Sequence, residues 1–97
     1  MNPRMETGLK ISIQKYLKKA GAWELKTWGG SMQRKGIPDI LVCYRGRFIA
    51  FEVKMPGEKP TKLQEYELSQ IKKAGGIAEV VYSLKEVKET IDGIKEE

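Results

Sequence analysis

The chain has 97 residues, the length of one small domain, and 40% of them are apolar and 32% charged. It contains no histidine, which excludes Ser-His-Asp and Cys-His catalysis and His-ligated zinc. The single cysteine, Cys43, excludes an internal disulfide and a cysteine metal cluster. No apolar run approaches membrane-spanning length, and no secretory leader opens the chain. We therefore expect one soluble cytoplasmic domain over residues 1–97, whose chemistry uses carboxylates, lysines and a hard metal ion.

Positive charge is concentrated in the first four fifths of the chain. Residues 1–78 hold 15 basic and 7 acidic residues, a net charge of +8, whereas residues 79–97 hold 3 basic and 6 acidic residues, a net charge of −3. Clustered lysine and arginine are typical of surfaces that bind nucleic acid. Many basic proteins bind none, so the charge alone leaves this question open.

Glycine and proline divide the chain into helices and strands. The hydrophobic pattern predicts, in chain order, a helix over 3–20, strands over 22–28, 37–44 and 47–54, a helix over 61–74, a strand over 77–82 and a last helix that follows Ser83. Gly21 ends the first helix, and Arg45-Gly46 is typical of a tight hairpin. Thr61 and Gln64 form a capping-box pattern at the start of the second helix.

Three strands in succession predict a meander, because short connections favour antiparallel neighbours. The helix between the third and fourth strands is a crossover, which favours parallel pairing of those two strands. The order α-β-β-β-α-β-α therefore predicts an α/β fold with a mixed central sheet flanked by helices.

Three charged residues are expected to meet at one end of this sheet. Glu52 and Lys54 end an otherwise apolar strand and point to the same face, because side chains alternate along a strand. Asp39 begins the apolar run of the preceding strand, and a short hairpin places the start of one strand beside the end of the other. Each residue alone has a structural interpretation, as a turn residue or a surface ion pair. Together they favour a functional site.

Two carboxylates and an amine suit metal-assisted hydrolysis of a phosphodiester. The carboxylates fit a hard cation such as Mg²⁺, and the lysine can orient a water or neutralise charge on a phosphate. A carboxylate pair alone would also suit glycoside hydrolysis. The lysine and the basic surroundings favour a phosphate substrate.

These residues match a known family. The run Gly36-Ile37-Pro38-Asp39-Ile40, followed by Glu52-Val53-Lys54 and by Thr61-x-x-Gln64, resembles the VRR-NUC family of the PD-(D/E)xK nuclease superfamily over roughly residues 4–82. The resemblance implies a restriction-endonuclease-like αβββαβα core and divalent-metal-dependent cleavage of DNA.

The resemblance also implies roles for individual residues. Asp39 and Glu52, joined by the backbone carbonyl of Val53, would hold Mg²⁺ or Mn²⁺. Lys54 would serve the water and the transition state, and Gln64 would complete the site. The capping box gives Gln64 an equally good structural role, and both roles can hold at once.

Further candidates surround this set. Glu6 extends the inward-facing stripe of the first helix and is a fourth possible carboxylate ligand, although the helix dipole also favours an acidic residue in the first turn. The basic loop before Asp39 and the first helix supply candidates for contacts with DNA phosphates, with solvated surface as the alternative. These candidates are Gln33, Arg34, Lys35 and Lys10.

Four other residues carry expectations about packing. Trp23 and Trp28 are expected in the core or at a subunit contact rather than as platforms for stacking bases. Cys43 is expected to be a small buried hydrophobe. Glu67 lies on the apolar sector of the second helix, where a hydrophobic residue is expected, and a dimer contact or an edge position would account for it.

The function expected from the resemblance is a structure-specific DNA endonuclease of DNA repair that acts as a homodimer on branched DNA such as four-way (Holliday) junctions. The small size favours recognition of structure, because the chain has no separate module to read base edges. Cutting two strands symmetrically needs two sites related by a two-fold axis. A flap or restriction-type nuclease with a partner subunit, and a catalytically silent DNA-binding module, are the alternatives. A virus-type family is consistent with a phage protein in the host cytoplasm.

Overall fold

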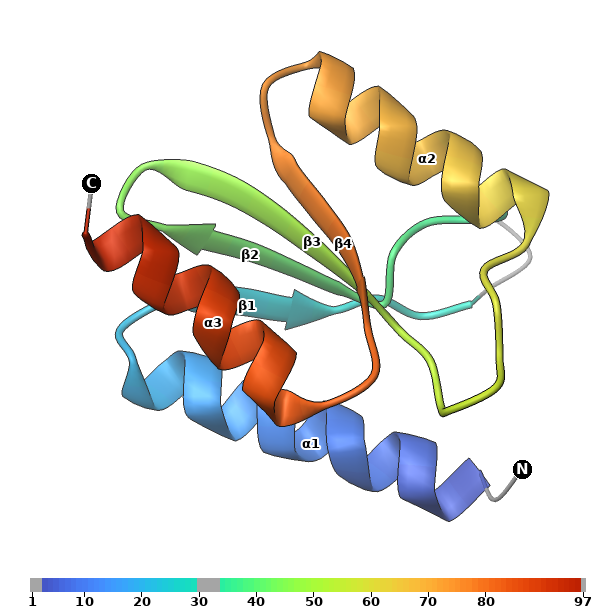
Figure 1. The fold of residues 1–97 in the computed structure, drawn as a ribbon, viewed down its shortest axis with the longest axis horizontal. Helices are drawn as coiled ribbons and strands as arrows, with labels where there is room; N and C mark the ends of the chain where they lie inside the picture. The colour runs from blue at the N-terminus through green and yellow to red at the C-terminus, as the bar shows by residue number, and fades with distance from the viewer. Residues whose placement is uncertain (1–2, 30–33, 97) are drawn as a thin grey trace.

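The computed structural model describes residues 3–29 and 34–96 (Figure 1). Its elements are α1 (Pro3–Lys19), β1 (Trp23–Lys26), β2 (Ile40–Tyr44), β3 (Arg47–Val53), α2 (Lys62–Lys73), β4 (Ile77–Val81) and α3 (Leu84–Lys95). The predicted αβββαβα order is therefore confirmed. None of the helices described in these two ranges is long and apolar enough to cross a membrane.

The four strands form one mixed sheet in the order β1-β2-β3-β4. β1, β2 and β3 pair antiparallel, and β3 and β4 pair parallel, which confirms both the meander and the crossover. The β2–β3 turn consists of Arg45 and Gly46, both with positive φ (50° and 78°). Two central residues with positive φ match the twist of the flanking strands, so this turn fixes the register of the hairpin.

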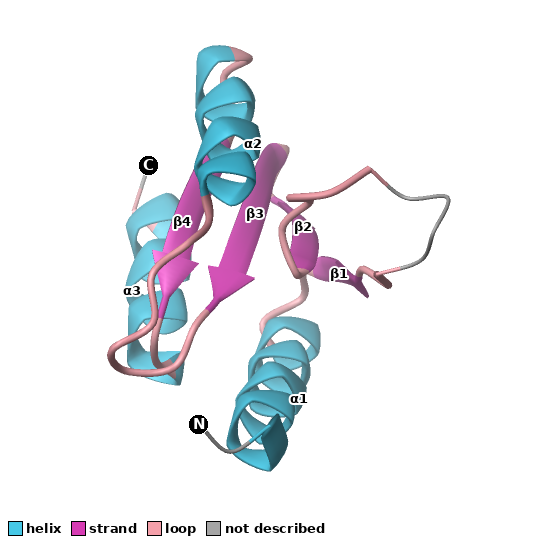
Figure 2. Cartoon of the chain, turned by 90° about the vertical axis from the view of Figure 1, so that its right-hand side faces the viewer, coloured by secondary structure: helices cyan, strands magenta, loops and turns pink. Residues whose placement is uncertain are grey.

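Helices cover the two faces of the sheet unequally. α1 and α3 lie side by side on one face, where they bury apolar side chains against β2, β3 and β4 (Figure 1). The other face carries α2, which packs over β3 and β4 through a smaller cluster centred on Ala50, Leu68 and Ala78 (Figure 2). The fold therefore has three layers over β3 and β4 and two layers over β1 and β2.

The part of the sheet that α2 leaves open carries apolar side chains. Trp23, Cys43 and Phe48 are paired in register across β1, β2 and β3, and all three are exposed. The expectation that Cys43 is buried is wrong, because it faces the side of the sheet without a helix. Trp23 does not lie in the core for the same reason.

Candidate active site

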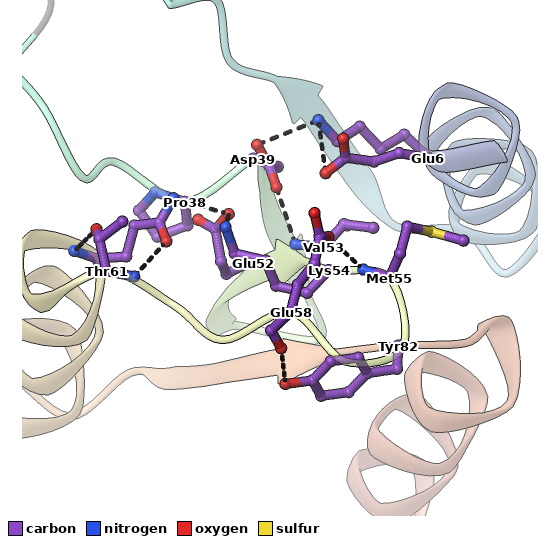
Figure 3. Close-up of polar contacts among 12 residues, drawn as sticks. Glu6, Pro38, Asp39, Glu52, Val53, Lys54, Met55, Glu58, Thr61 and Tyr82 are labelled. Carbon is purple, nitrogen blue, oxygen red and sulfur yellow. Dashed lines mark hydrogen bonds and ion pairs between the residues drawn. The ribbon is translucent and has the colours of Figure 1, made fainter. Parts of the chain in front are cut away.

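The base of the β2–β3 hairpin brings Asp39 beside Glu52. Ile40 pairs with Phe51, so the residue before Ile40 lies next to the residue after Phe51. The Oδ2 atom of Asp39 accepts a hydrogen bond of 2.9 Å from the backbone N–H of Val53 (Figure 3). This bond fixes the carboxylate against the end of β3, so the two acidic residues meet where the sequence predicts.

The backbone on either side of Asp39 is held by its neighbours. The N–H of Thr27 donates to the carbonyl of Asp39 at 2.8 Å, and the hydroxyl of Thr27 donates to the carbonyl of Pro38 at 2.8 Å. Gly36 has a φ of +90°, and a Cβ there would lie 2.6 Å from the carbonyl oxygen of Leu63 on α2. Glycine therefore meets two requirements at this position, a left-handed backbone and a close approach to α2.

Glu52 is almost completely buried, with 2% of its surface exposed. Its Oε2 atom accepts a hydrogen bond of 3.3 Å from Nε2 of Gln64 and lies 4.0 Å from Nζ of Lys54. Its Oε1 atom has no hydrogen-bond partner among the described residues. A buried polar atom without a partner is costly, so this oxygen is suited to a ligand that the protein chain itself does not supply.

The burial of Glu52 and its closeness to Asp39 change the pKa of its carboxyl group. The pKa of Glu52 is raised to about 8, chiefly by burial and then by the neighbouring Asp39 carboxyl group, against the opposing effects of Lys54 and Lys10. Two ionised carboxylates cannot hydrogen-bond each other, whereas a proton on Glu52 can be shared with Asp39. A divalent cation between the two carboxylates would offset their mutual repulsion, as a shared proton does, so the pair fits a metal ion chemically.

Lys10 on α1 stands next to the carboxylate pair. Its Nζ lies 3.3 Å from Oδ1 of Asp39 and 4.0 Å from Oε1 of Glu6, one helical turn away (Figure 3). Glu6 is thus connected to Asp39 through a lysine. No group of three or more His, Cys, Asp or Glu side chains within residues 3–29 and 34–96 is close enough to hold a metal. The role of Glu6 as an additional ligand stays a prediction.

Gln64 makes both of the contacts that its two roles require. Its Oε1 accepts from the N–H of Thr61 at 2.8 Å, and the hydroxyl of Thr61 accepts from the N–H of Gln64 at 3.2 Å, which completes the capping box of α2. Its Nε2 donates to Glu52. The same side chain therefore starts a helix and orients a buried carboxylate.

The basic loop before Asp39 is tied to α2. Nη2 of Arg34 donates to Oε1 of Glu67 at 2.9 Å, and Glu67 is buried among its neighbours. This ion pair accounts for an acidic residue at a position where a hydrophobe is expected. Lys35 is exposed, and Gln33 lies outside the described residues. The predicted contacts of this loop with DNA stay predictions.

A cleft of about 520 Å³ opens beside Asp39. Its walls come from α1, from the end of β1 and from the loop that precedes Asp39. Among the described residues that line it, four are basic, namely Lys10, Lys26, Arg34 and Lys35, and Trp28 lines it as well. Sequence reasoning missed that Lys26 and Trp28 line this cleft. The signal was available, because Lys26 is the last residue of β1, Trp28 lies two residues further on, and both lead into the basic loop.

Several solved structures resemble this chain, including the following two. One, described as a VRR_NUC domain, is 29% identical, with a TM-score of 0.75, and the alignment covers 90% of this chain and 94% of that one. The other is the Holliday junction resolvase Hjc of Archaeoglobus fulgidus, 23% identical, with a TM-score of 0.62, covering 79% of this chain and 67% of that one. No protein-family profile and no curated protein sequence matches the chain.

The fold and the acidic pair define a class of protein. The mixed four-stranded sheet with its described helices is the restriction-endonuclease-like nuclease fold. Within that class the chain is VRR-NUC-like, as its Pro38-Asp39 and Glu52-Val53-Lys54 segments predict.

Proposed function

We propose that this protein is a metal-dependent endonuclease that hydrolyses phosphodiester bonds in DNA. The observation that carries the proposal is the buried Glu52, one oxygen of which has no partner in the part of the chain that the structure describes, next to Asp39 and Lys54 at the end of a VRR-NUC-like sheet. Asp39, Glu52 and the carbonyl of Val53 would hold Mg²⁺ or Mn²⁺. Hard cations of this kind keep several waters, so few protein ligands suffice.

Each side chain has a task in such a reaction. A bound divalent ion would polarise the scissile phosphate and lower the pKa of a water. Lys54 offers positive charge at the site, where it can orient the attacking water or offset charge that develops on the phosphate. Gln64 keeps Glu52 oriented through its 3.3 Å hydrogen bond, and Lys10 holds Asp39 from the opposite side.

The proposed substrate is branched DNA, four-way junctions in particular. The excess of basic residues in positions 1–78 supports a polyanionic substrate, and the fold is shared with a Holliday junction resolvase. The cleft beside Asp39 adds four cations close to the acidic pair, where a phosphate backbone could approach.

The proposal is tested by cleavage of junction, flap and linear duplex DNA in Mg²⁺, Mn²⁺ and EDTA. Asp39→Asn keeps the shape of the side chain and should lower cleavage at least about 100-fold, because it removes the negative charge of a proposed metal ligand. Asp92→Asn, an exposed aspartate on α3, is the matched control and should cleave as the wild type does.

The outcomes separate the candidate functions. Cleavage of junctions that needs the metal and Asp39 supports the proposal. A preference for flaps, or activity only with an added partner, supports a different nuclease. Junction binding without cleavage under every metal condition identifies a silent binding module and refutes the proposal.

We further propose that the active form is a homodimer. The exposed side of β1 and β2 presents uncharged side chains, namely the row Trp23–Cys43–Phe48 and, beside it, the exposed Leu25 and the partly buried Leu41, which a second copy could cover. An uncharged, flat apolar surface is suited to a self-complementary two-fold contact. Two copies would also supply the two active sites that symmetric cutting requires.

Sedimentation tests this assembly. The wild type should sediment at twice the 11.0 kDa mass of the chain. Phe48→Glu places a charge at the β3 end of the Trp23–Cys43–Phe48 row and should yield monomers, whereas Ile11→Glu, at a similarly exposed position on α1, should leave the dimer intact. A monomeric wild type, or equal effects of both variants, would contradict the assignment of this face.

A further inference from the structure

The cleft beside Asp39 contains an unusually exposed aromatic residue. Trp28 follows β1 and is 75% exposed, although it is one of the largest apolar side chains in the protein. Nζ of Lys26 lies 5.0 Å from the centre of its indole ring, a cation–π contact. The lysine covers part of the ring, and most of the residue's surface stays open to solvent. Trp28 therefore does not pack in the core, and its alternative expected place, at a subunit contact, stays a prediction.

The surroundings of Trp28 indicate what could cover it. Lys10, Lys26, Arg34 and Lys35 line the same cleft, and Asp39 is the acidic residue among them. A second copy of this chain is a poor occupant, because a two-fold contact would bring two such basic clusters together. The positive charge of the cleft favours an anionic ligand, and the exposed indole favours a ligand with a flat apolar surface. A nucleotide offers both, as a phosphate and a base.

The base must be accessible for such a contact. In a paired duplex the faces of the bases are stacked on each other, so an indole cannot reach them. In unpaired DNA every base presents a face that can stack on an aromatic side chain. The volume of about 520 Å³ lies within the usual range of ligand sites, about 300–1,000 Å³.

We propose that this cleft is a binding site for an unpaired nucleotide, whose base stacks on Trp28 and whose phosphate is held by the lysines and arginine of the cleft. Because Asp39 lines the same cleft, the bound nucleotide lies next to the scissile phosphate. This inference rests on the proposed nuclease function and deepens it. It gives a physical reason for preferring branched DNA, since bases at a branch point unstack more easily than those in a continuous duplex.

Fluorescence tests the stacking contact directly. The chain has two tryptophans, so Trp23→Phe leaves Trp28 as the sole indole, and Trp28→Phe leaves Trp23. Titration with a short single-stranded oligodeoxythymidylate in EDTA should quench the emission of the Trp23→Phe variant. The Trp28→Phe variant is the matched control, and its emission should stay unchanged because Trp23 is not part of the cleft.

Affinity separates stacking from general attraction between charges. Trp28→Ala should bind the single strand at least about fivefold more weakly, the lower limit for loss of one stacked base. Its affinity for a blunt duplex of the same length should change by less than about twofold. Trp28→Phe keeps an aromatic ring and should retain most of the single-strand affinity. Thermal unfolding of each variant controls for folding.

Junction cleavage by the wild type in Mg²⁺, measured in parallel, keeps this inference distinct from the proposed function. If the wild type cleaves junctions but emission of Trp28 does not respond to single strands, the inference is refuted and the nuclease stands. If Trp28→Ala weakens single-strand and duplex binding equally, the stacking site is also refuted. Quenching without cleavage supports the nucleotide site and refutes the nuclease.

Discussion

Glu52 should make the metal-free protein less stable as the pH rises. The pKa of this carboxyl group is about 8 in the folded chain, against 4.5 for an ordinary glutamate. The folded state therefore holds a proton that the unfolded chain releases at lower pH. The resulting stabilisation is fully present below pH 4.5 and is lost as the pH rises through 8.

The size of the effect follows from the pKa difference. One pKa unit corresponds to about 1.4 kcal/mol, so the loss between pH 4.5 and pH 9 amounts to at most about 5 kcal/mol. Small domains have total stabilities of about 5–15 kcal/mol, so this single group can remove a large part of the total. Glu52→Gln keeps the size of the side chain and cannot ionise, so this variant should lack the decline that Glu52 causes.

Urea unfolding in EDTA at several values between pH 5 and pH 9 measures the effect. The free energy of unfolding of the wild type should fall across this range relative to that of Glu52→Gln. Asp39, Lys54 and Lys10, which face Glu52, are present in both proteins, so the difference between the two curves reports Glu52. Mg²⁺ added at pH 8 should restore stability to the wild type and much less to the variant. Parallel curves for the two proteins in EDTA would refute the reasoning.

Two other contacts at the site give sharp comparisons. Gln64→Ala should lower cleavage about 10- to 100-fold because it releases Glu52, and should lower the free energy of unfolding by about 1 kcal/mol because it opens the cap of α2. Thr61→Ala should lower the free energy of unfolding by a similar amount and retain most of the cleavage activity in the same assays. Gly36→Ala should lower the midpoint of thermal unfolding more than Gly57→Ala, because both glycines have φ near +90° but only Gly36 approaches another backbone closely. Equal effects within either pair would contradict the corresponding argument.

The fold could be predicted from local signals that agree with one another. Arg45 and Gly46 form the tight hairpin turn that the sequence predicts, and the capping box at Thr61 starts α2 where expected. The ends of the strands were less predictable. The strands predicted over 22–28 and 37–44 are shorter, since the pairing between them ends at Lys26 and Ile40. Hydrophobic alternation cannot show where a partner strand stops.

The acidic pair was predictable because the hairpin register places Asp39 beside Glu52 without help from the rest of the fold. The environments of Cys43 and Glu67 could not be predicted in this way. Cys43 is exposed because α2 covers only half of one sheet face, and Glu67 is buried because Arg34 reaches it from a loop 33 residues away. Both depend on how a helix sits across the sheet, which the local pattern does not encode.

The position of Gln64 couples the formation of α2 to the assembly of the site. The amide that closes the capping box with Thr61 is the one that holds Glu52, so the carboxylate is oriented only when the first turn of the helix has formed. Gly36 reinforces this dependence, because it packs the loop before Asp39 against the same turn at Leu63. The site therefore depends on tertiary contacts of α2 as well as on the hairpin. A change that displaces the Gln64 amide from Glu52 should therefore reduce activity before it unfolds the sheet, whereas loss of the Thr61 hydroxyl alone leaves that amide in place.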